Sequence, residues 1–300
     1  MRILLAYDGS SDGEKARDLI GNLNLPDDTQ VSIVSVLPPP STLFHADTLQ
    51  PAHAADADRR LAEDAEAELD VAARFLSAAG RTVDVKVLRG RPGDTIVDEA
   101  TRRDVDLVVM GSRGHGPFKS ALLGSVSTEV VNASARPVLI ARGISVHRVL
   151  VATDGSEDAM LAARAAISLV HDTGAELHVV HVGPKHVYPP PTAGPTPPTG
   201  TDRELRQEAQ GVLDWQVDEI TKAGGEITQA HLRMGRPAEE IMHLSEELVV
   251  GLIVVGNQGL GGRFSRMRHI LMGSVSEKVS RYARCSVMVI RKDLYDRPSA

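Results

Sequence analysis

Short apolar runs of strand length alternate along the chain with longer stretches in which apolar residues recur at helical spacing. In the first half, this pattern predicts strands over residues 2–6, 30–37, 82–88, 106–110 and 137–141. The runs are apolar almost throughout, which is typical of strands that helices bury on both faces. The alternation therefore predicts an α/β fold built from βαβ units around a parallel sheet.

Residues 56–79 form the longest amphipathic stretch of the first half, and it ends at Gly80. Its apolar stripe consists of Leu61, Ala65, Leu69, Ala72, Leu76 and Ala79. With this helix, each half is expected to hold five strands and four helices. Residues 38–55 and 184–200, which follow the second strand of each half, are expected to be solvated loops, with a lid over a ligand as the alternative.

The second half of the chain repeats the first in the same order. Residues 3–10 return as 149–156, residues 90–92 as 235–237, residues 108–111 as 253–256, and residues 124–127 as 273–276. The length of 300 residues also suits two domains of about 150 residues each. We therefore predict two fused copies of one domain, over residues 1–143 and 147–292.

Charge and cysteine content narrow the range of partners and locations. The formal net charge of -7 offers no electrostatic attraction to nucleic acid or to an anionic membrane, so neither is expected as a partner. No apolar run reaches the length of a membrane span, and charge appears too early after Met1 for a signal peptide. Cys285 is the single cysteine. We therefore expect a reducing, cytoplasmic setting.

In an open parallel sheet, ligands bind outside the carboxyl ends of the strands, which directs attention to three segments of the first copy. The first is the turn after the first strand, where Asp8 leaves the sheet and Ser11 with Glu14 is predicted to form a capping box. From this turn alone, a ligand-binding Asp8 and an Asp8 that only forms the turn remain equal alternatives.

The other two segments suit an anionic ligand. Residues 111–116 form a glycine-rich loop after the fourth strand, in which Arg113 offers a positive charge and His115 is either a phosphate contact or an exposed loop residue. Ser125 follows Gly124 at the predicted start of the next helix, where unpaired amides favour phosphate. Taken alone, Ser125 also suits an ordinary helix cap.

Together these segments read Gly111, two residues, Gly114, nine residues, then Gly124 and Ser125. This spacing, with the Asp-Gly-Ser turn, resembles the ATP-binding branch of the universal stress protein (UspA) family, over almost the entire chain and twice. The resemblance implies a Rossmann-like fold of the adenine nucleotide alpha-hydrolase type, with each five-stranded sheet in the order 3-2-1-4-5. It also implies ATP as the ligand and Mg²⁺ bridging its phosphates, with few direct protein ligands.

Site residues are carried over from the family by position. Adenine and ribose are expected against Ala6, Tyr7, Asp8, Val36 and Met110. The phosphates are expected against Gly111, Arg113, Gly114, Gly124, Ser125, Val126 and Ser127. In the second copy the matching positions are Thr153, Asp154, Val182, Val255, Gly256, Gly259, Gly273, Ser274, Val275 and Ser276.

The second copy departs from the spacing of the first. Thirteen residues rather than nine separate Gly259 from Gly273, and Gln258 stands in place of the arginine. Arg263, Arg266 and Arg268 lie within the inserted stretch and are candidates to replace that charge. The alternatives are a degraded site, in which the insertion serves packing or dimer formation, and a site that still binds nucleotide, which we favour.

Other nucleotide and metal sites do not match. No glycine precedes a Lys-Ser or Lys-Thr pair, as a P-loop requires, and the glycines of a dinucleotide fingerprint are missing after the first strand. A haloacid-dehalogenase phosphatase needs a nucleophilic aspartate two residues before the Asp-Gly pair, and this chain has Ala6 and Ala152 at those positions. His178 and His181 fall on opposite faces of a predicted strand and cannot chelate one metal together. Cys285 suits a small core residue better than a nucleophile.

The first functional hypothesis is a binding protein in stress response, not an enzyme: the copies form a pseudo-dimer, bind ATP, and change partner interactions with nucleotide occupancy. By the resemblance, the copies associate through their fifth strands, 137–141 and Ser286–Ile290. Whether two tandem chains also form a homodimer is left open by the sequence. A slow ATP hydrolase or nucleotidyl enzyme is the second hypothesis, with His115 and Asp8 as candidate bases. The third is a dimeric scaffold that binds no nucleotide.

Overall fold

The computed structural model of the chain describes residues 1–39, 51–114, 123–185, 201–258 and 272–291. The first copy contains β1 (Arg2–Ala6), α1 (Ser11–Asn22), β2 (Gln30–Leu37), α3 (Pro51–Ala78), β3 (Thr82–Arg89), α4 (Pro92–Arg102), β4 (Leu107–Gly111), α5 (Ser125–Ala133) and β5 (Val138–Ala141). The second contains β6 (Arg148–Thr153), α6 (Glu157–Val170), β7 (Glu176–Gly183), α7 (Asp202–Lys222), β8 (Gln229–Met234), α8 (Pro237–Glu247), β9 (Leu252–Gly256), α9 (Ser274–Tyr282) and β10 (Ser286–Ile290).

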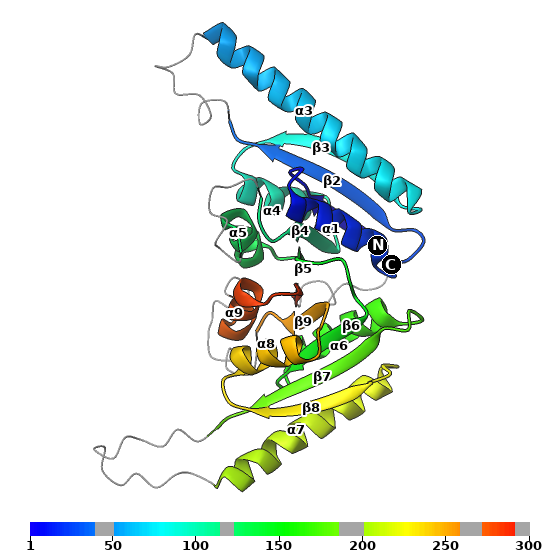
Figure 1. Ribbon diagram of the computed structural model, residues 1–300, viewed down its shortest axis with the longest axis vertical. Coiled ribbons are helices and arrows are strands. Elements are labelled where there is room, and N and C mark those ends of the chain that lie inside the picture. Colours follow the sequence, from blue (N-terminus) through cyan, green and yellow to red (C-terminus); the bar gives the residue numbers. More distant parts are fainter. Residues whose placement is uncertain (40–50, 115–122, 186–200, 259–271, 292–300) are drawn as a thin grey trace, which may run out of the picture.

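The strands form one continuous sheet, drawn end to end in Figure 1, in the order β3-β2-β1-β4-β5-β10-β9-β6-β7-β8. Each half therefore has the predicted order 3-2-1-4-5 with parallel neighbours. The fifth strands pair as predicted and run antiparallel, with Leu139 opposite Met288. The two expected five-stranded sheets are thus one ten-stranded sheet, because this pairing satisfies the edge strand of each half.

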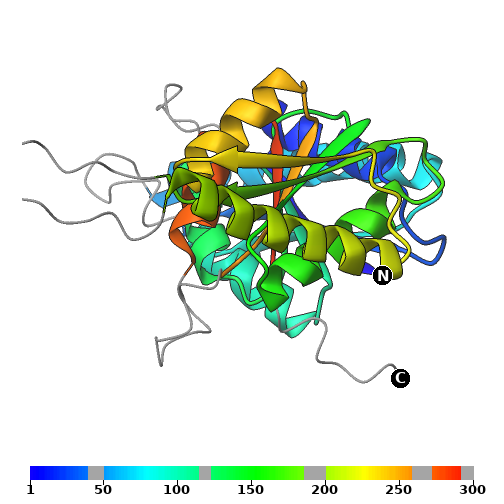
Figure 2. The same ribbon diagram turned by 90° about the horizontal axis from the view of Figure 1, so that it is seen from below.

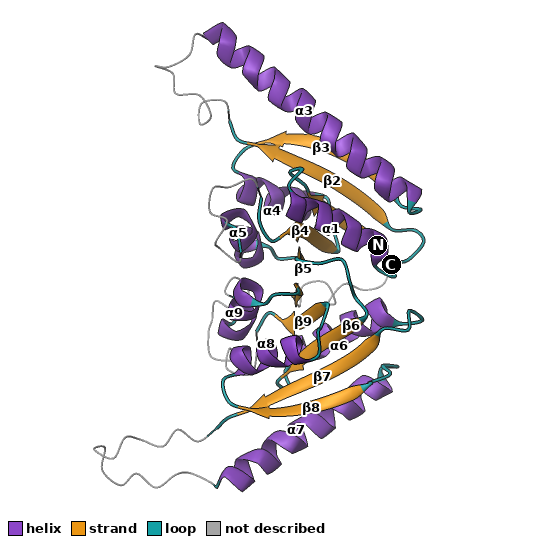
Figure 3. Ribbon diagram, in the orientation of Figure 1, coloured by secondary structure: helices purple, strands orange, loops and turns teal. Residues whose placement is uncertain are grey.

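Helices cover both faces of the sheet (Figures 2 and 3). Leu19 of α1, Leu69 of α3, Ala163 of α6 and Leu213 of α7 belong to one buried apolar cluster. The opposite face carries a second cluster, to which Ile96 of α4, Val130 of α5, Ile241 of α8 and Val279 of α9 belong. The strands supply side chains to both clusters, which explains why their sequences are apolar almost throughout.

One predicted helix boundary is wrong. The helix expected over residues 56–79 begins earlier, at Pro51, so the end of the segment expected to be irregular is helical. Proline suits the first turn of a helix, and the alanines that follow it have the highest helix propensity. None of the described helices combines the length and the apolar character that crossing a membrane requires.

Glu99 on α4 makes the free energy of unfolding depend on pH in the acidic range. It is 6% exposed, and its carboxylate accepts hydrogen bonds from Arg102 (2.5 and 2.7 Å) and Arg103 (2.7 Å). The hydrogen bonds from Arg102 lower its pKa most; burial opposes this and Arg103 adds to it, so the pKa is about 2 instead of the ordinary 4.5. Stability that this group adds is therefore complete above pH 4.5 and is lost as the pH falls toward 2.

We accordingly expect Glu99→Gln to cost about 1–2 kcal/mol in the free energy of unfolding at pH 7 and roughly half of that or less at pH 3, because part of the stabilisation is lost only as the pH approaches 2. Urea unfolding of wild type and variant at the two pH values measures this difference. A cost that stays the same at pH 3 would show that the charge of Glu99 contributes nothing.

Candidate functional site

The first copy has a cavity of about 530 Å³ at the carboxyl ends of its strands. Every residue that the sequence assigned to the nucleotide site of this copy lines it: Ala6, Tyr7, Asp8, Val36, Met110, Gly111, Arg113, Gly114, Gly124, Ser125, Val126 and Ser127. The fold therefore brings the turn after β1, the end of β2, the loop after β4 and the start of α5 to one place.

Four further residues line the cavity that the sequence did not predict: Val34, Pro92, Ile96 and Leu123. Val34, Ile96 and Leu123 belong to the buried apolar cluster on the α4 and α5 face. Pro92 begins α4. Only Pro92 carried a signal in the sequence, because residues 90–92 recur as 235–237, but nothing in the sequence assigned that repeat to a binding site.

The wall nearest the sheet is apolar. Met110 is buried in the cluster on the α4 and α5 face, and Ala6 and Val36 pack against the same cluster. Tyr7 belongs instead to the cluster on the opposite face, where burial raises the pKa of its hydroxyl above the ordinary value. A flat apolar group such as a nucleobase is suited to this end of the cavity.

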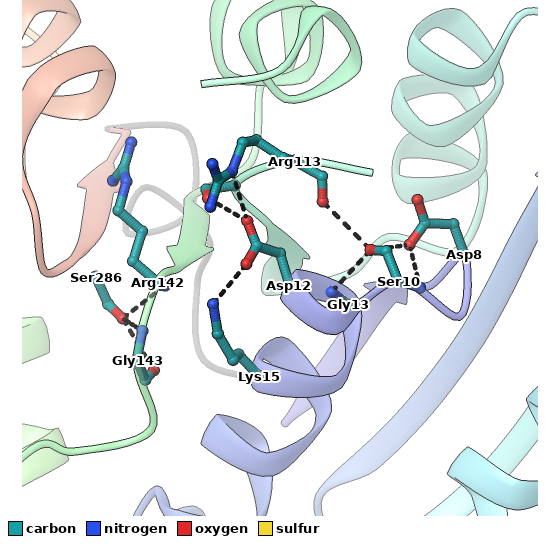
Figure 4. Close-up of polar contacts among 10 residues, drawn as sticks. Asp8, Ser10, Asp12, Gly13, Lys15, Arg113, Arg142, Gly143 and Ser286 are labelled. Carbon is teal, nitrogen blue, oxygen red and sulfur yellow. Dashed lines mark hydrogen bonds and ion pairs between the residues drawn. The ribbon is translucent and has the colours of Figure 1, made fainter. Parts of the chain in front are cut away.

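The turn after β1 is held by hydrogen bonds between its own side chains (Figure 4). Asp8 Oδ1 accepts from the backbone N–H of Ser10 (3.1 Å) and from its hydroxyl (2.5 Å). Ser10 Oγ in turn accepts from the backbone N–H of Gly13 (3.1 Å) and is the N-cap of α1. The capping box predicted for Ser11 and Glu14 is therefore wrong, because the helix is capped one residue earlier.

Gly111 and Gly114 let neighbouring segments approach closely. A Cβ atom on Gly111 would lie 2.6 Å from the backbone carbonyl carbon of Asp12, so the end of β4 packs directly on the start of α1. A Cβ atom on Gly114 would lie 2.2 Å from Asp8 Oδ2. The glycine loop and the turn after β1 thus meet at the mouth of the cavity.

Arg113 lines the cavity, and its side chain also pairs with Asp12 (Figure 4). Arg113 Nε lies 3.1 Å from Asp12 Oδ2, which also accepts from Ser112 Oγ (2.7 Å), while Lys15 Nζ lies 2.6 Å from Asp12 Oδ1. Burial raises the pKa of Asp12, but hydrogen bonds from Lys15, Ser112 and Arg113 outweigh it, so the pKa lies below its ordinary value. Asp12 therefore stays ionised and orients Arg113.

The start of α5 has no side-chain cap. Its N-cap is Gly124, and Ser125 is the first helical residue, so the alternative in which Ser125 is an ordinary cap is wrong. By contrast, Ser10 caps α1, and α4 begins with proline. Ser127 Oγ donates to the carbonyl oxygen of Gly111 (2.9 Å) and ties α5 to the end of β4. The uncapped amides at this helix start suit an anion.

The second copy repeats much of this scaffold. Asp154 Oδ1 accepts from the backbone N–H of Ser156 (3.0 Å), and Ser156 caps α6. Gly273 is the N-cap of α9 and again supplies no side-chain hydrogen bond, so Ser274, Val275 and Ser276 form the uncapped first turn. Ser276 Oγ donates to the carbonyl oxygen of Asn257 (2.9 Å), one residue beyond Gly256, the position that matches Gly111.

The copies differ where Gln258 replaces Arg113. The backbone N–H of Gln258 donates to Asp158 Oδ2 (3.0 Å), the position that matches Asp12. Asp12 and Asp158 were not predicted as site residues, although their matching positions in the two copies were a signal.

Other predicted residues of the second copy lie at the carboxyl ends of β6, β7 and β9, the strands that match β1, β2 and β4. Thr153 ends β6, Val182 lies near the end of β7, and Val255 and Gly256 end β9. The carbonyl oxygen of Thr153 lies 2.9 Å from Nδ1 of the buried His181. The predicted residues His115, Gly259, Arg263, Arg266 and Arg268 lie outside the described residues.

Among the described residues, His178 and Cys285 add neither a metal site nor a reactive thiol to the sheet. His178 contacts His231 of the neighbouring strand (Nδ1 to Nε2, 3.1 Å). In the described part of the chain, no group of three or more histidine, cysteine or carboxylate side chains is arranged to hold a metal ion. Burial raises the pKa of the Cys285 thiol to about 11, which does not suit a nucleophile.

Comparisons with known proteins agree with the repeat. The sequence pattern of the family described as "Universal stress protein family" matches residues 1–142 and 145–291. A universal stress protein of Mycolicibacterium smegmatis is 30% identical over 224 residues, which cover 71% of this chain and 70% of the relative. One of Mycobacterium tuberculosis is 30% identical over 246 residues, covering 80% and 78%. The crystal structure of a universal stress protein from Archaeoglobus fulgidus is 28% identical, with a TM-score of 0.67 and coverage of 97% and 96%.

Proposed function

Because the chain belongs to the universal stress protein family, we propose that its first copy binds ATP and that nucleotide occupancy regulates its interactions during stress. The observation that carries this proposal is the cavity of the first copy. Apolar strand ends form one wall of it, and the glycine loop and the uncapped start of α5 form another. Its volume of about 530 Å³ lies within the usual range for sites of small ligands and cofactors.

Each part of ATP has a chemically suitable neighbour. Adenine fits the apolar end formed by Ala6, Val36 and Met110, and the exposed carboxylate of Asp8 suits the ribose hydroxyl groups. The phosphates are assigned to the backbone amides at the start of α5 and to Arg113. The Ser127 hydroxyl already donates to Gly111, so we expect this residue to contribute its backbone amide instead.

Mg²⁺ is proposed to accompany ATP, where it would neutralise phosphate charge. Its usual partners in such sites are phosphate oxygens and water, with one or two carboxylates at most. Asp8 is the one carboxylate among the described residues that line the cavity.

A hydrolytic function has less support. A general base must be within reach of the attacking water and able to accept its proton. Asp8 Oδ1 already accepts two hydrogen bonds that hold the turn, and His115 lies outside the described residues. We therefore propose a nucleotide-binding protein rather than an ATP hydrolase or a nucleotidyl enzyme.

The second copy is proposed to bind nucleotide as well, because the turn at Asp154 and the uncapped start of α9 match the first copy. The pairing of β5 with β10 makes the chain a pseudo-dimer. A cytoplasmic location remains a prediction of the sequence, and a homodimer of two chains remains an open alternative.

Nucleotide content tests the proposal. We expect mass spectrometry of purified, then denatured protein to find ATP, and a single-turnover assay with added Mg²⁺ to release no phosphate. Release of phosphate in that single turnover would indicate the hydrolase instead. A protein that holds no nucleotide and takes up none in solution would indicate a scaffold and contradict the proposal.

A further inference from the structure

Two arginines cross between the copies at matching positions. Arg142 follows β5 and donates from Nη2 to the carbonyl oxygen of Ser280 on α9. Arg291 follows β10 and donates from Nη2 to the carbonyl oxygen of Val131 on α5 (2.5 Å) and more weakly to that of Asn132 (3.3 Å). Val131 and Ser280 occupy equivalent positions of their helices, so the two contacts are related by the symmetry of the repeat.

Arg291 binds the end of α5 where carbonyl groups need a partner. The last carbonyls of a helix have no partner within the helix, and the backbone N–H of Ser134 takes only that of Val130. No basic residue of α5 lies in its own last turn. Arg291 is 4% exposed and brings a positive charge to this negative helix end, a stabilising arrangement that α5 does not supply itself.

The other end of the same helix lines the cavity. Ser125, Val126 and Ser127 line it from the first turn of α5, and the whole helix is only nine residues long. The Ser127 hydroxyl fixes the start of the helix to Gly111, and Arg291 fixes its end to the second copy. Two anchors at opposite ends set the direction in which the first-turn amides point.

Arg142 makes the matching contact to α9, although Arg281 already lies in the last turn of that helix, and Arg142 also lies beside the first copy's loop. Figure 4 shows its side chain near Arg113, which Asp12 holds. Burial lowers the pKa of Arg142 to about 10, and the charges of Asp12 and Arg113 act on it in opposite directions. Its guanidinium group therefore hydrogen-bonds the second copy's helix and lies within electrostatic range of Asp12 and Arg113 in the first copy.

We propose that Arg291 is a positioning residue for the phosphate end of the first copy's site, and that Arg142 has this role for the second copy. An arginine of one copy then binds the carbonyl end of the helix whose first turn faces the phosphates in the other copy. This inference rests on the proposed ATP binding, and it adds that the affinity of one copy depends on an arginine of the other.

The test uses the full chain with Arg291→Gln, Arg291→Lys and the control Arg284→Gln. Arg284 also lies near the end of α9, but its side chain is 80% exposed and pairs with Glu246 on the surface. Calorimetry with Mg·ATP gives the Kd, photolabelling with 8-azido-ATP followed by peptide mapping assigns it to a copy, and amide hydrogen exchange reports on α5 without nucleotide.

With Arg291→Gln we expect exchange in the last turn of α5 to accelerate about tenfold and the Kd of the first copy to rise about fivefold. Arg291→Lys is expected to restore part of both, since its charge reaches the same carbonyls with fewer donors. Arg284→Gln is expected to change neither.

An unchanged Kd in the first copy, with faster exchange in α5, would overturn the positioning role and leave ATP binding intact. A wild-type protein that binds no ATP would overturn the proposed function and, with it, this inference. Because the exchange measurement needs no nucleotide, it separates these two failures. Equal effects of Arg284→Gln and Arg291→Gln would also contradict the inference, since they would point to net charge.

Discussion

Gly114→Ala is expected to weaken ATP binding to the first copy by about tenfold or more, with little loss of fold stability. The added methyl group would lie 2.2 Å from Asp8 Oδ2, so the carboxylate proposed for the ribose must move. It also occupies space where we expect phosphate to approach the backbone. The tenfold change corresponds to about 1.4 kcal/mol and is measured as the Kd for Mg·ATP by calorimetry.

Gly143→Ala is the matched control for this variant. It adds the same methyl group in the same copy, but no other atom lies within 4 Å of the new Cβ. We expect its Kd to equal that of wild type. A Gly114→Ala protein that binds ATP as tightly as Gly143→Ala would remove the glycine loop from the proposed site.

Gly111→Ala is expected to lower the free energy of unfolding by about 3 kcal/mol, the upper part of the range for overpacking a core. Its Cβ would meet the backbone of Asp12 at 2.6 Å, and a Cβ on Gly256 would meet that of Asp158 at 2.7 Å. Unlike the carboxylate near Gly114, a helix backbone cannot move aside without shifting α1 or α6. Gly256→Ala is therefore expected to cost about as much, and urea unfolding measures both.

Gly211→Ala is the same chemical change but is expected to raise the free energy of unfolding instead of lowering it. Gly211 lies on the exposed side of α7, where an added Cβ has no other atom within 4 Å. Alanine there should stabilise the protein by up to about 1 kcal/mol, because glycine is a poor helix former. If Gly111→Ala were as harmless as Gly211→Ala, the close packing of β4 on α1 would be incorrect. This comparison tests the fold independently of any ligand.

The strands and the order of the sheet could be predicted because each carries a local signal. Strands β1, β2 and β10 have the predicted bounds, β3 and β5 differ by one residue at one end, and β4 begins and ends one residue later than predicted. The internal repeat gave the two copies, and the spacing from Gly111 to Ser125 located the residues that line one cavity. These features depend on hydrophobic pattern and on glycine positions, which the sequence displays directly.

Features that depend on contacts between distant residues were not predicted. The hydrogen bond of Arg113 to Asp12 joins the loop after β4 to the first turn of α1, and an arginine in a glycine loop gives no sign of a protein partner. The N-cap is Ser10 rather than Ser11, with the Ser10 hydroxyl donating to Asp8 and accepting from Gly13, and both serines have the residue type of a cap. Arg291 reaches Val131 only because β5 and β10 join the copies.

The central claim is that the loop at Gly114 and the start of α5 bind the phosphates of one nucleotide. The most direct measurement is a two-dimensional NMR titration of nucleotide-free, ¹⁵N-labelled protein with Mg·ATP and, separately, with adenosine. We predict that ATP shifts the amide signals of Gly114, Ser125 and Val126 together with one Kd, whereas adenosine leaves all three in place. ATP binding that shifts none of these amides, or shifts the loop without the helix, would contradict the account.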